Sequence, residues 1–289
     1  NSYPVQAIGY CLKEAEKRGL ELTSVGYAWD CENYAQLATE NLKNTIEKYP
    51  SSTDDISLKV QESLNALYDP EMVRYNLSHI LRKKGYELDD LNFKFYAHHL
   101  CHAASAQYCT DFEESVIIIN DGVGEVASST LYHYTSEGEF KELENVELPH
   151  TLGGLYASIT EYLGFRPYMD EGKTMGLAAY GKPNEKIKAV FDEIAQDIED
   201  SFQYEVNPRY RYNGERTYGK KFTDKLVEKL GNPRVYGESA MQDPYPDIAY
   251  AAQKQLEEFL LSQVKYAAGL GLSKNACFAG GVHMNCKAN

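Results

Sequence analysis

Two histidines four residues apart, followed by an apolar run that leads into an aspartate, constrain this sequence more than any other feature. His98 and His102 lie in the stretch 96–106, and Asp121 closely follows the apolar run 116–119. On a helix, residues four apart project from the same face, so one cation can contact both imidazoles. A carboxylate after a buried strand lies where open sheets place their ligands. The set suits Fe, Mn or Zn, and the pattern does not choose between them.

A histidine pair alone is weak evidence, because such pairs more often pack in a core or face solvent. The turn after Asp121 strengthens the interpretation, because Gly122 and Gly124 allow a phosphate to approach the backbone closely. A lone Gly-x-Gly motif would be weak as well. The two features together predict a metal–nucleotide site around His98, His102 and Asp121.

Composition bounds the class of protein. The 289 residues suffice for one large domain or two ordinary ones, and a hydrophobic content of 43% supports a packed core. No apolar run has the length of a membrane span, and no signal-peptide pattern opens the chain, so we expect no membrane partner. Six cysteines without a Cys-x-x-Cys pair indicate reduced thiols and a cytoplasmic location. A net charge of −14 argues against a nucleic-acid partner but not against a small anionic substrate, and it leaves oligomer formation open.

The hydrophobic pattern predicts an α/β chain. Before the histidines we expect amphipathic helices that cover a sheet, with strands at 22–29 and 92–96. After Asp121 we expect a β-meander, because the runs 128–135 and 139–148 alternate around a turn. The other expected elements are a helix over 152–164, a polar helix over 184–200, an exposed tyrosine-rich excursion over 205–233, a long helix over 247–268 and a buried strand over 276–279.

Glycines stand at two further places where a ligand can approach the backbone. Gly153 and Gly154 open the helix after 151, and Gly280 and Gly281 follow the last strand, so both pairs fit contact with a nucleotide. Simple capping and tight packing explain a glycine pair equally well. Lys173 lies in a glycine-rich segment, 172–183, which is a candidate anion contact although its spacing is not that of a Walker motif.

Five segments in order resemble the NodU/CmcH family of O-carbamoyltransferases. The resemblance covers nearly the whole chain and is weakest over 40–90 and 195–245. It implies an ASKHA (actin-like ATPase) α/β fold, with mixed sheets flanked by helices, of the kind seen in TsaD. The segments are 98–106 (His-His-Leu-Cys-His-Ala-Ala-Ser-Ala), 121–125 (Asp-Gly-Val-Gly-Glu), 152–156 with 161–165 (Leu-Gly-Gly-Leu-Tyr and Glu-Tyr-Leu-Gly-Phe), 173–183 (Lys-Thr-Met-Gly-Leu-Ala-Ala-Tyr-Gly-Lys-Pro), and 279–282 with Asn285-Cys286 and Ala288-Asn289.

The resemblance also implies a reaction. In the family a YrdC-like domain makes carbamoyl-adenylate from carbamoyl phosphate and ATP, and the TsaD-like domain transfers the carbamoyl group to a hydroxyl of a small-molecule acceptor. His98, His102 and Asp121 match the family's iron ligands, although another divalent metal is equally compatible with the residues. Gly122 and Gly124 are then expected at the phosphate, Gly280, Gly281 and Asn285 at the adenosine side, and Lys173 beside an anionic oxygen.

Two family segments have no counterpart in these 289 residues. They are a His-Asp-Ala-Ser stretch expected before Asn1, which would supply the general base, and an Asp-Ala-Gly segment expected beyond Asn289, which would add a metal ligand. We therefore expect a partial TsaD-like domain over 1–289, truncated at both ends, nearly inactive alone, with the YrdC-like domain further along the chain. Two alternatives are a non-catalytic nucleotide-binding module of the same fold and TsaD-like tRNA threonylcarbamoyl transfer. The negative charge and the segments at 121–125 and 175–178 count against the tRNA alternative.

Overall fold

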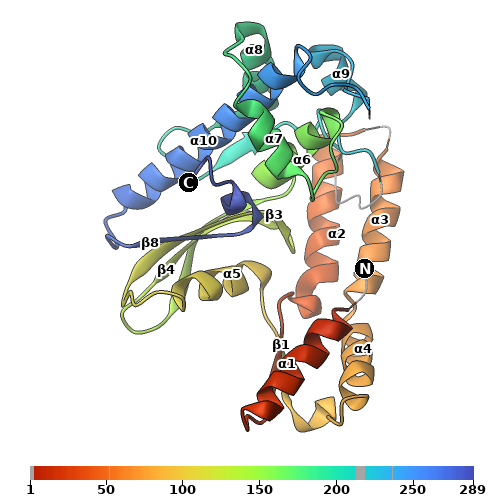
Figure 1. Ribbon diagram of the computed structural model, residues 1–289, viewed down its shortest axis with the longest axis vertical. Coiled ribbons are helices and arrows are strands. Elements are labelled where there is room, and N and C mark those ends of the chain that lie inside the picture. Colours follow the sequence, from red (N-terminus) through yellow and green to blue (C-terminus); the bar gives the residue numbers. More distant parts are fainter. Residues whose placement is uncertain (1–2, 52, 213–218, 236) are drawn as a thin grey trace.

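A four-stranded mixed sheet of order β5-β4-β3-β8 lies at the centre of the fold (Figure 1). The computed structural model describes residues 3–51, 53–212, 219–235 and 237–289. Strands β3, β4 and β5 pair antiparallel, which confirms the expected meander, and β8 pairs parallel with β3. The parallel partner brings the C-terminal residues beside the strand that carries Asp121. The strands are β3 (Ser115–Gly124), β4 (Ala127–Tyr134), β5 (Phe140–Glu147) and β8 (Ala276–Ala279).

The apolar run of β3 is buried on both faces of the sheet. Successive side chains of a strand point to opposite faces, so a continuous apolar run fits a strand that is covered on both sides. Ile117 and Ile119 pack with Ala103 of α5 (His98–Gln107), whereas Ile118 packs in the larger cluster with residues of α6 (Leu152–Tyr162) and α10 (Tyr245–Gly269). Figure 1 shows α5 below the sheet and α6 and α10 above it.

The expected polar helix over 184–200 is too long. Helix α8 (Glu185–Ile194) ends where Ala195 adopts an extended backbone and begins strand β6 (Ala195–Asp197), which pairs with β7 (Tyr204–Val206). The buried Gln255 amide of α10 donates to the carbonyl oxygens of Phe191 (2.7 Å) and Ala195 (3.2 Å). A helix leaves its last carbonyl groups unpaired, so this side chain satisfies the end of α8.

The segment 205–233 is not an exposed excursion in its described part. Val206, Tyr210, Phe222 and Leu226 are buried in the same cluster as α6 and α10. Two hydrogen bonds join residues 210–212 to residues 221–223. Tyr212 N–H donates to the Lys221 carbonyl oxygen, and Thr223 N–H donates to the Tyr210 carbonyl oxygen, each at 3.1 Å. Residues 213–218 lie outside the described residues. The same cluster takes side chains from α7 (Glu171–Ala178) and α9 (Asp224–Leu230).

The N-terminal helices cover a second, smaller sheet. Strands β1 (Ser24–Tyr27) and β2 (Asn92–Phe95) pair in parallel. Helix α4 begins at Pro70, and the Asp69 carboxylate caps it by accepting from Met72 N–H at 2.9 Å. Helices α2 and α3 reach toward the central sheet, where Val126 packs on their cluster (Figure 1). The remaining elements here are α1 (Val5–Lys17), α2 (Cys31–Lys48), α3 (Asp54–Leu67), α4 (Pro70–Arg82) and η1 (Leu88–Asp90).

These findings confirm a mixed α/β architecture, and the actin-like assignment stays a prediction from the resemblance. No described helix combines the length and the apolar character that crossing a membrane requires. All six cysteines are free thiols, as the sequence pattern indicated.

Gly280 provides a test of this architecture. It links β8 to η2 (Gly281–Met284) at φ 92°, and a Cβ there would overlap the Asn120 carbonyl oxygen of β3. We expect Gly280→Ala to lower the free energy of unfolding by about 2 to 4 kcal/mol in urea titrations. Gly269→Ala is the matched control, because a Cβ there meets nothing within 4 Å, and it should leave stability unchanged or slightly higher. Equal effects of the two substitutions would contradict the proposed close approach of β8 and β3.

Candidate metal centre

Asp121 lies in an irregular stretch of β3 rather than after its end. The ladder with β4 is regular through Asn120 and resumes at Gly124, with a register shift between them. The sequence predicted a turn here, but the strand continues to Gly124. An irregularity of this kind changes the direction of the side chains within it, and bulges are common beside functional sites. The Asp121 carboxylate is thereby placed against α5.

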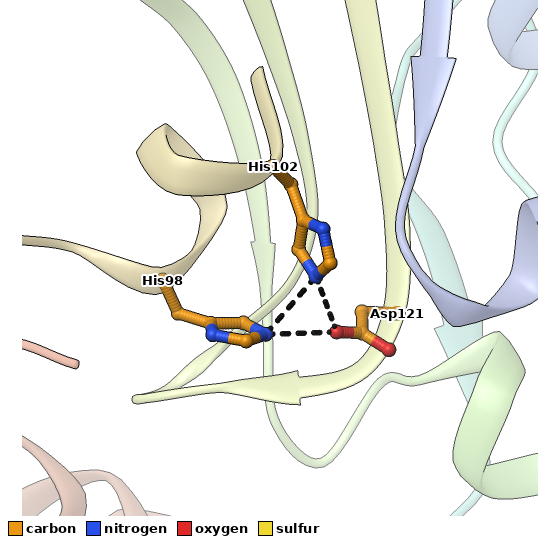
Figure 2. Close-up of side chains that lie close together, drawn as sticks. All are labelled: His98, His102 and Asp121. Atoms are coloured by element: carbon orange, nitrogen blue, oxygen red, sulfur yellow. Dashed lines mark hydrogen bonds and ion pairs between the residues drawn. The ribbon is translucent and has the colours of Figure 1, made fainter. Parts of the chain in front are cut away.

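The structure brings the three expected ligand residues together. The Nε2 atoms of His98 and His102 each lie 3.1 Å from Oδ2 of Asp121, and 3.1 Å from one another. Figure 2 shows both imidazoles, from one face of α5, pointing toward the carboxylate of β3. This is the one group of three or more metal-ligating side chains among the described residues. Cys101, between the histidines, is not part of it.

Glu125 fixes the start of the helix that carries both histidines. Its carboxylate oxygens accept from His98 N–H at 3.1 and 3.2 Å, and one of them also accepts from Asp30 N–H at 2.7 Å. A negative charge at a helix N-terminus satisfies unpaired N–H groups and interacts favourably with the helix dipole. Burial raises the pKa of Glu125, although the backbone hydrogen bonds oppose that shift. Glu125 therefore positions His98 through the backbone.

The second oxygen of Asp121 is held by two backbone N–H groups. Oδ1 accepts from Gly122 N–H at 2.8 Å and from Gly281 N–H at 3.2 Å. A Cβ at Gly281 would lie 3.0 Å from that oxygen, so a larger residue would crowd the carboxylate. Burial acts to raise the pKa of Asp121, but the hydrogen bonds with His102, His98 and Gly122 outweigh it and lower that pKa well below its usual range. The group is thus a fixed carboxylate.

The His98 ring is oriented by its other nitrogen. Nδ1 lies 3.1 Å from the Ala28 carbonyl oxygen, which accepts a hydrogen bond from Nδ1–H, so neutral His98 presents a lone pair at Nε2. Burial acts to lower the pKa of His98, but the bonds to Asp121 and Ala28 outweigh it and raise that pKa. The neighbouring His99 differs, because burial lowers its pKa to about 3 and its Nδ1 bonds Thr130 Oγ1 at 2.6 Å. His99 is therefore a neutral packing residue.

The cluster fits a divalent transition metal. Three facial ligands of an octahedral ion, each about 2.1 Å from it, lie about 3.0 Å apart. The measured separations of 3.1 Å match that geometry. Two imidazoles and one carboxylate form the facial triad that binds non-haem Fe(II) and leaves other positions open. When both imidazoles are neutral and present Nε2 lone pairs, a cation between them and Oδ2 of Asp121 would compensate the three lone pairs that face one another.

Asp121 also forms part of the wall of a cavity of about 400 Å³. Gly122 and Gly281 both line this cavity, so the two glycine turns open on one space although they are far apart in sequence. Gly153 lines it too, and a Cβ there would lie 2.7 Å from the Asp121 carbonyl oxygen. The other lining residues are Tyr156, Tyr168, Met169, Glu171, Gly172, Met175, Leu256, Val282, Met284 and Asn285.

Three of the expected nucleotide-binding glycines have packing contacts and do not line this cavity. A Cβ at Gly124 would lie 2.6 Å from the His99 ring, and a Cβ at Gly154 would lie 2.6 Å from the Arg211 guanidinium. Gly280 abuts the Asn120 carbonyl group. Each glycine therefore has a structural reason of its own, independent of a ligand.

The two polar side chains expected at the nucleotide already have partners. Lys173 Nζ lies 3.1 Å from Asp170 Oδ1, is more than half exposed, and does not line the cavity. Asn285 lines the cavity, but its amide exchanges hydrogen bonds with that of Gln253 at 2.9 and 3.1 Å. Contact of either with an anionic substrate stays a prediction.

Comparison with known proteins identifies the family. The family model described as "Carbamoyltransferase N-terminus" matches residues 1–289. The Synechocystis sp. protein sll1178 is 33% identical over 302 residues, covering 100% of this chain and 45% of that protein. The nodulation protein NolNO of Sinorhizobium fredii is 30% identical over 290 residues, covering 100% of this chain and 37% of that protein. The chain thus spans less than half the length of these relatives.

The cluster should bind one divalent cation. We expect the chain to bind Fe(II) or Co(II) with one-to-one stoichiometry in anaerobic calorimetric titrations, and His102→Ala to weaken that affinity at least about 100-fold, because a ligand is lost. His79→Ala is the control, since His79 is exposed on α4 and outside the cluster. An unchanged affinity in His102→Ala would show that the ion binds elsewhere.

Affinity for that ion should fall as the pH falls. Metal binds neutral imidazole, and the raised pKa of His98 means that protons already compete for it near neutral pH. Between pH 7.5 and 5.5 we expect affinity for Co(II) to drop by up to about 10-fold per pH unit for each titrating histidine. A flat profile in the wild-type chain would contradict imidazole ligation.

Proposed function

The chain belongs to the carbamoyltransferase N-terminal family, and we propose that it performs the transfer half of an O-carbamoyltransferase reaction. In this proposal a carbamoyl group passes from carbamoyl-adenylate, made from carbamoyl phosphate and ATP, to a hydroxyl of a small-molecule acceptor. The observation that carries it is the position of Asp121, which contacts both histidines and also lines the 400 Å³ cavity. In this proposal Asp121 is therefore both a metal ligand and part of the wall of the substrate cavity.

The cavity wall suits a nucleotide ester. Room for an anionic group near Asp121 exists because three lining positions, Gly122, Gly153 and Gly281, have no side chain. Apolar side chains that also line the cavity, including Leu256, Val282 and Met175, offer a surface for the flat face of a base.

The proposed transfer balances without a redox partner. The acceptor oxygen bonds to the carbamoyl carbon, the bond from that carbon to the adenylate oxygen breaks, and AMP and one proton leave. The metal, when bound, would supply Lewis-acid stabilisation of the negative charge that develops on an oxygen. The chain's own part is positional: Glu125 orients α5, and the N–H groups of Gly122 and Gly281 orient Asp121. Lys173 remains the proposed source of a positive charge near the leaving group.

Loss of a ligand should abolish transfer without unfolding the protein. In the full-length protein that carries this chain, we expect His98→Ala and Asp121→Asn to reduce transfer of labelled carbamoyl groups at least about 1000-fold, with an unchanged cooperative unfolding transition. His79→Ala, exposed on α4, should retain full activity. A fully active His98→Ala protein would exclude the role proposed for the cluster, whatever the acceptor.

A further inference from the structure

A second, smaller cavity lies on the other side of Gly122. It measures about 40 Å³, and Gly122 and Tyr168 line both this cavity and the larger one. It lies between the N-terminal helices and the β3–β4 connection, since Tyr34 and Leu42 of α2 and Val126 contribute to its wall. This volume holds one to a few water-sized groups, which is about the size of one carboxylate or phosphate group.

Arg211 brings a buried charge to this cavity, and no ion pair joins it to a carboxylate of the described residues. Its side chain is 9% exposed, and its one hydrogen bond to described residues runs from Nη1 to the Pro149 carbonyl oxygen at 3.3 Å. Its Nε is buried and has no hydrogen-bond partner among the described residues. A guanidinium stays protonated, and an unpaired buried charge is strongly unfavourable, so a counter-charge is expected nearby. Gly154 leaves the space in which this guanidinium sits.

Trp29, which also lines this cavity, carries a second unpartnered donor. The indole Nε1–H of Trp29 is buried and finds no acceptor in the described part of the chain. An indole N–H and a guanidinium only donate hydrogen bonds, so the missing group must present acceptor oxygens. Glu125 is the one carboxylate among the lining residues, and its oxygens already accept from the backbone N–H groups of Asp30 and His98.

We propose that this cavity is a binding subsite for a small oxyanion, held by Arg211 and the indole N–H of Trp29. The shared chemistry is a phosphoryl or carboxylate group on a substrate or acceptor. Through the common wall at Gly122, the anion would lie beside the cavity that contains Asp121. The proposal does not depend on carbamoyl transfer, since its test measures binding alone.

The chain contains a single tryptophan, so its fluorescence reports on this cavity. Chelator-treated, metal-free chain is titrated with inorganic phosphate, carbamoyl phosphate or acetate at constant ionic strength, with chloride as the reference salt. We expect a saturable change in Trp29 emission with at least one oxyanion and none with chloride. Tighter binding of the phosphoryl ligands would identify a phosphorylated ligand, and tighter binding of acetate would identify a carboxylate. No saturable binding of any of the three would overturn the proposal.

Variants separate a binding role from a structural one. We expect Arg211→Gln to weaken oxyanion affinity at least about 10-fold. Arg234→Gln is the matched control, because Arg234 is equally buried but donates to the carbonyl oxygens of Leu163, Gly164 and Glu238. It should stay within about 2-fold of wild type. His102→Ala should also retain binding, which distinguishes this subsite from the metal centre.

If Arg211→Gln fails to unfold cooperatively, Arg211→Lys and Trp29→Phe replace it, read by the rise in melting temperature that a bound oxyanion causes. Both should show a smaller rise than wild type at the same phosphate concentration. Equal affinity in all Arg211 and Trp29 variants would overturn the proposal.

Discussion

The Asp121 carboxylate connects three separate parts of the backbone. One oxygen contacts both histidines of α5, and the other accepts from N–H groups of Gly122 in β3 and Gly281 after β8. A buried carboxylate is unfavourable unless hydrogen bonds and a positive charge compensate it. Backbone amides satisfy one oxygen, and the histidines with a bound cation would satisfy the other. Because each oxygen has its own partners, the carboxylate cannot rotate without losing one set.

This arrangement explains the glycines around Asp121. Gly153 approaches the Asp121 carbonyl oxygen, and Gly281 approaches the carboxylate, so neither position has room for a side chain. Gly280 likewise packs on the backbone of Asn120, the residue before Asp121 in β3. Close backbone packing thus holds the parallel pair β3–β8 and the start of α6 around one carboxylate. Gly153 and Gly281 also line the larger cavity, whereas Gly280 does not.

The convergence of His98, His102 and Asp121 could be predicted from sequence because its information is local. His98 and His102 share a helix face through their spacing, and the apolar run before Asp121 marks a buried strand. Glu125 could not be found in this way, since its bonds to Asp30 and His98 join residues 95 and 27 positions apart. Arg211 was missed because its tyrosine- and charge-rich neighbourhood is typical of an exposed segment, whereas tertiary packing buries it. The end of α8 depended on Gln255, which is 64 positions from its hydrogen-bond partner Phe191.

X-ray absorption spectroscopy at the iron edge, on the iron-loaded chain, tests whether His98, His102 and Asp121 bind the metal. Ligation by these residues predicts a first shell of nitrogen and oxygen at about 2.1 Å and the outer-shell scattering of two imidazole rings. It also predicts that one ring signal disappears in His102→Ala. A spectrum without imidazole scattering, or one that His102→Ala leaves unchanged, would contradict it.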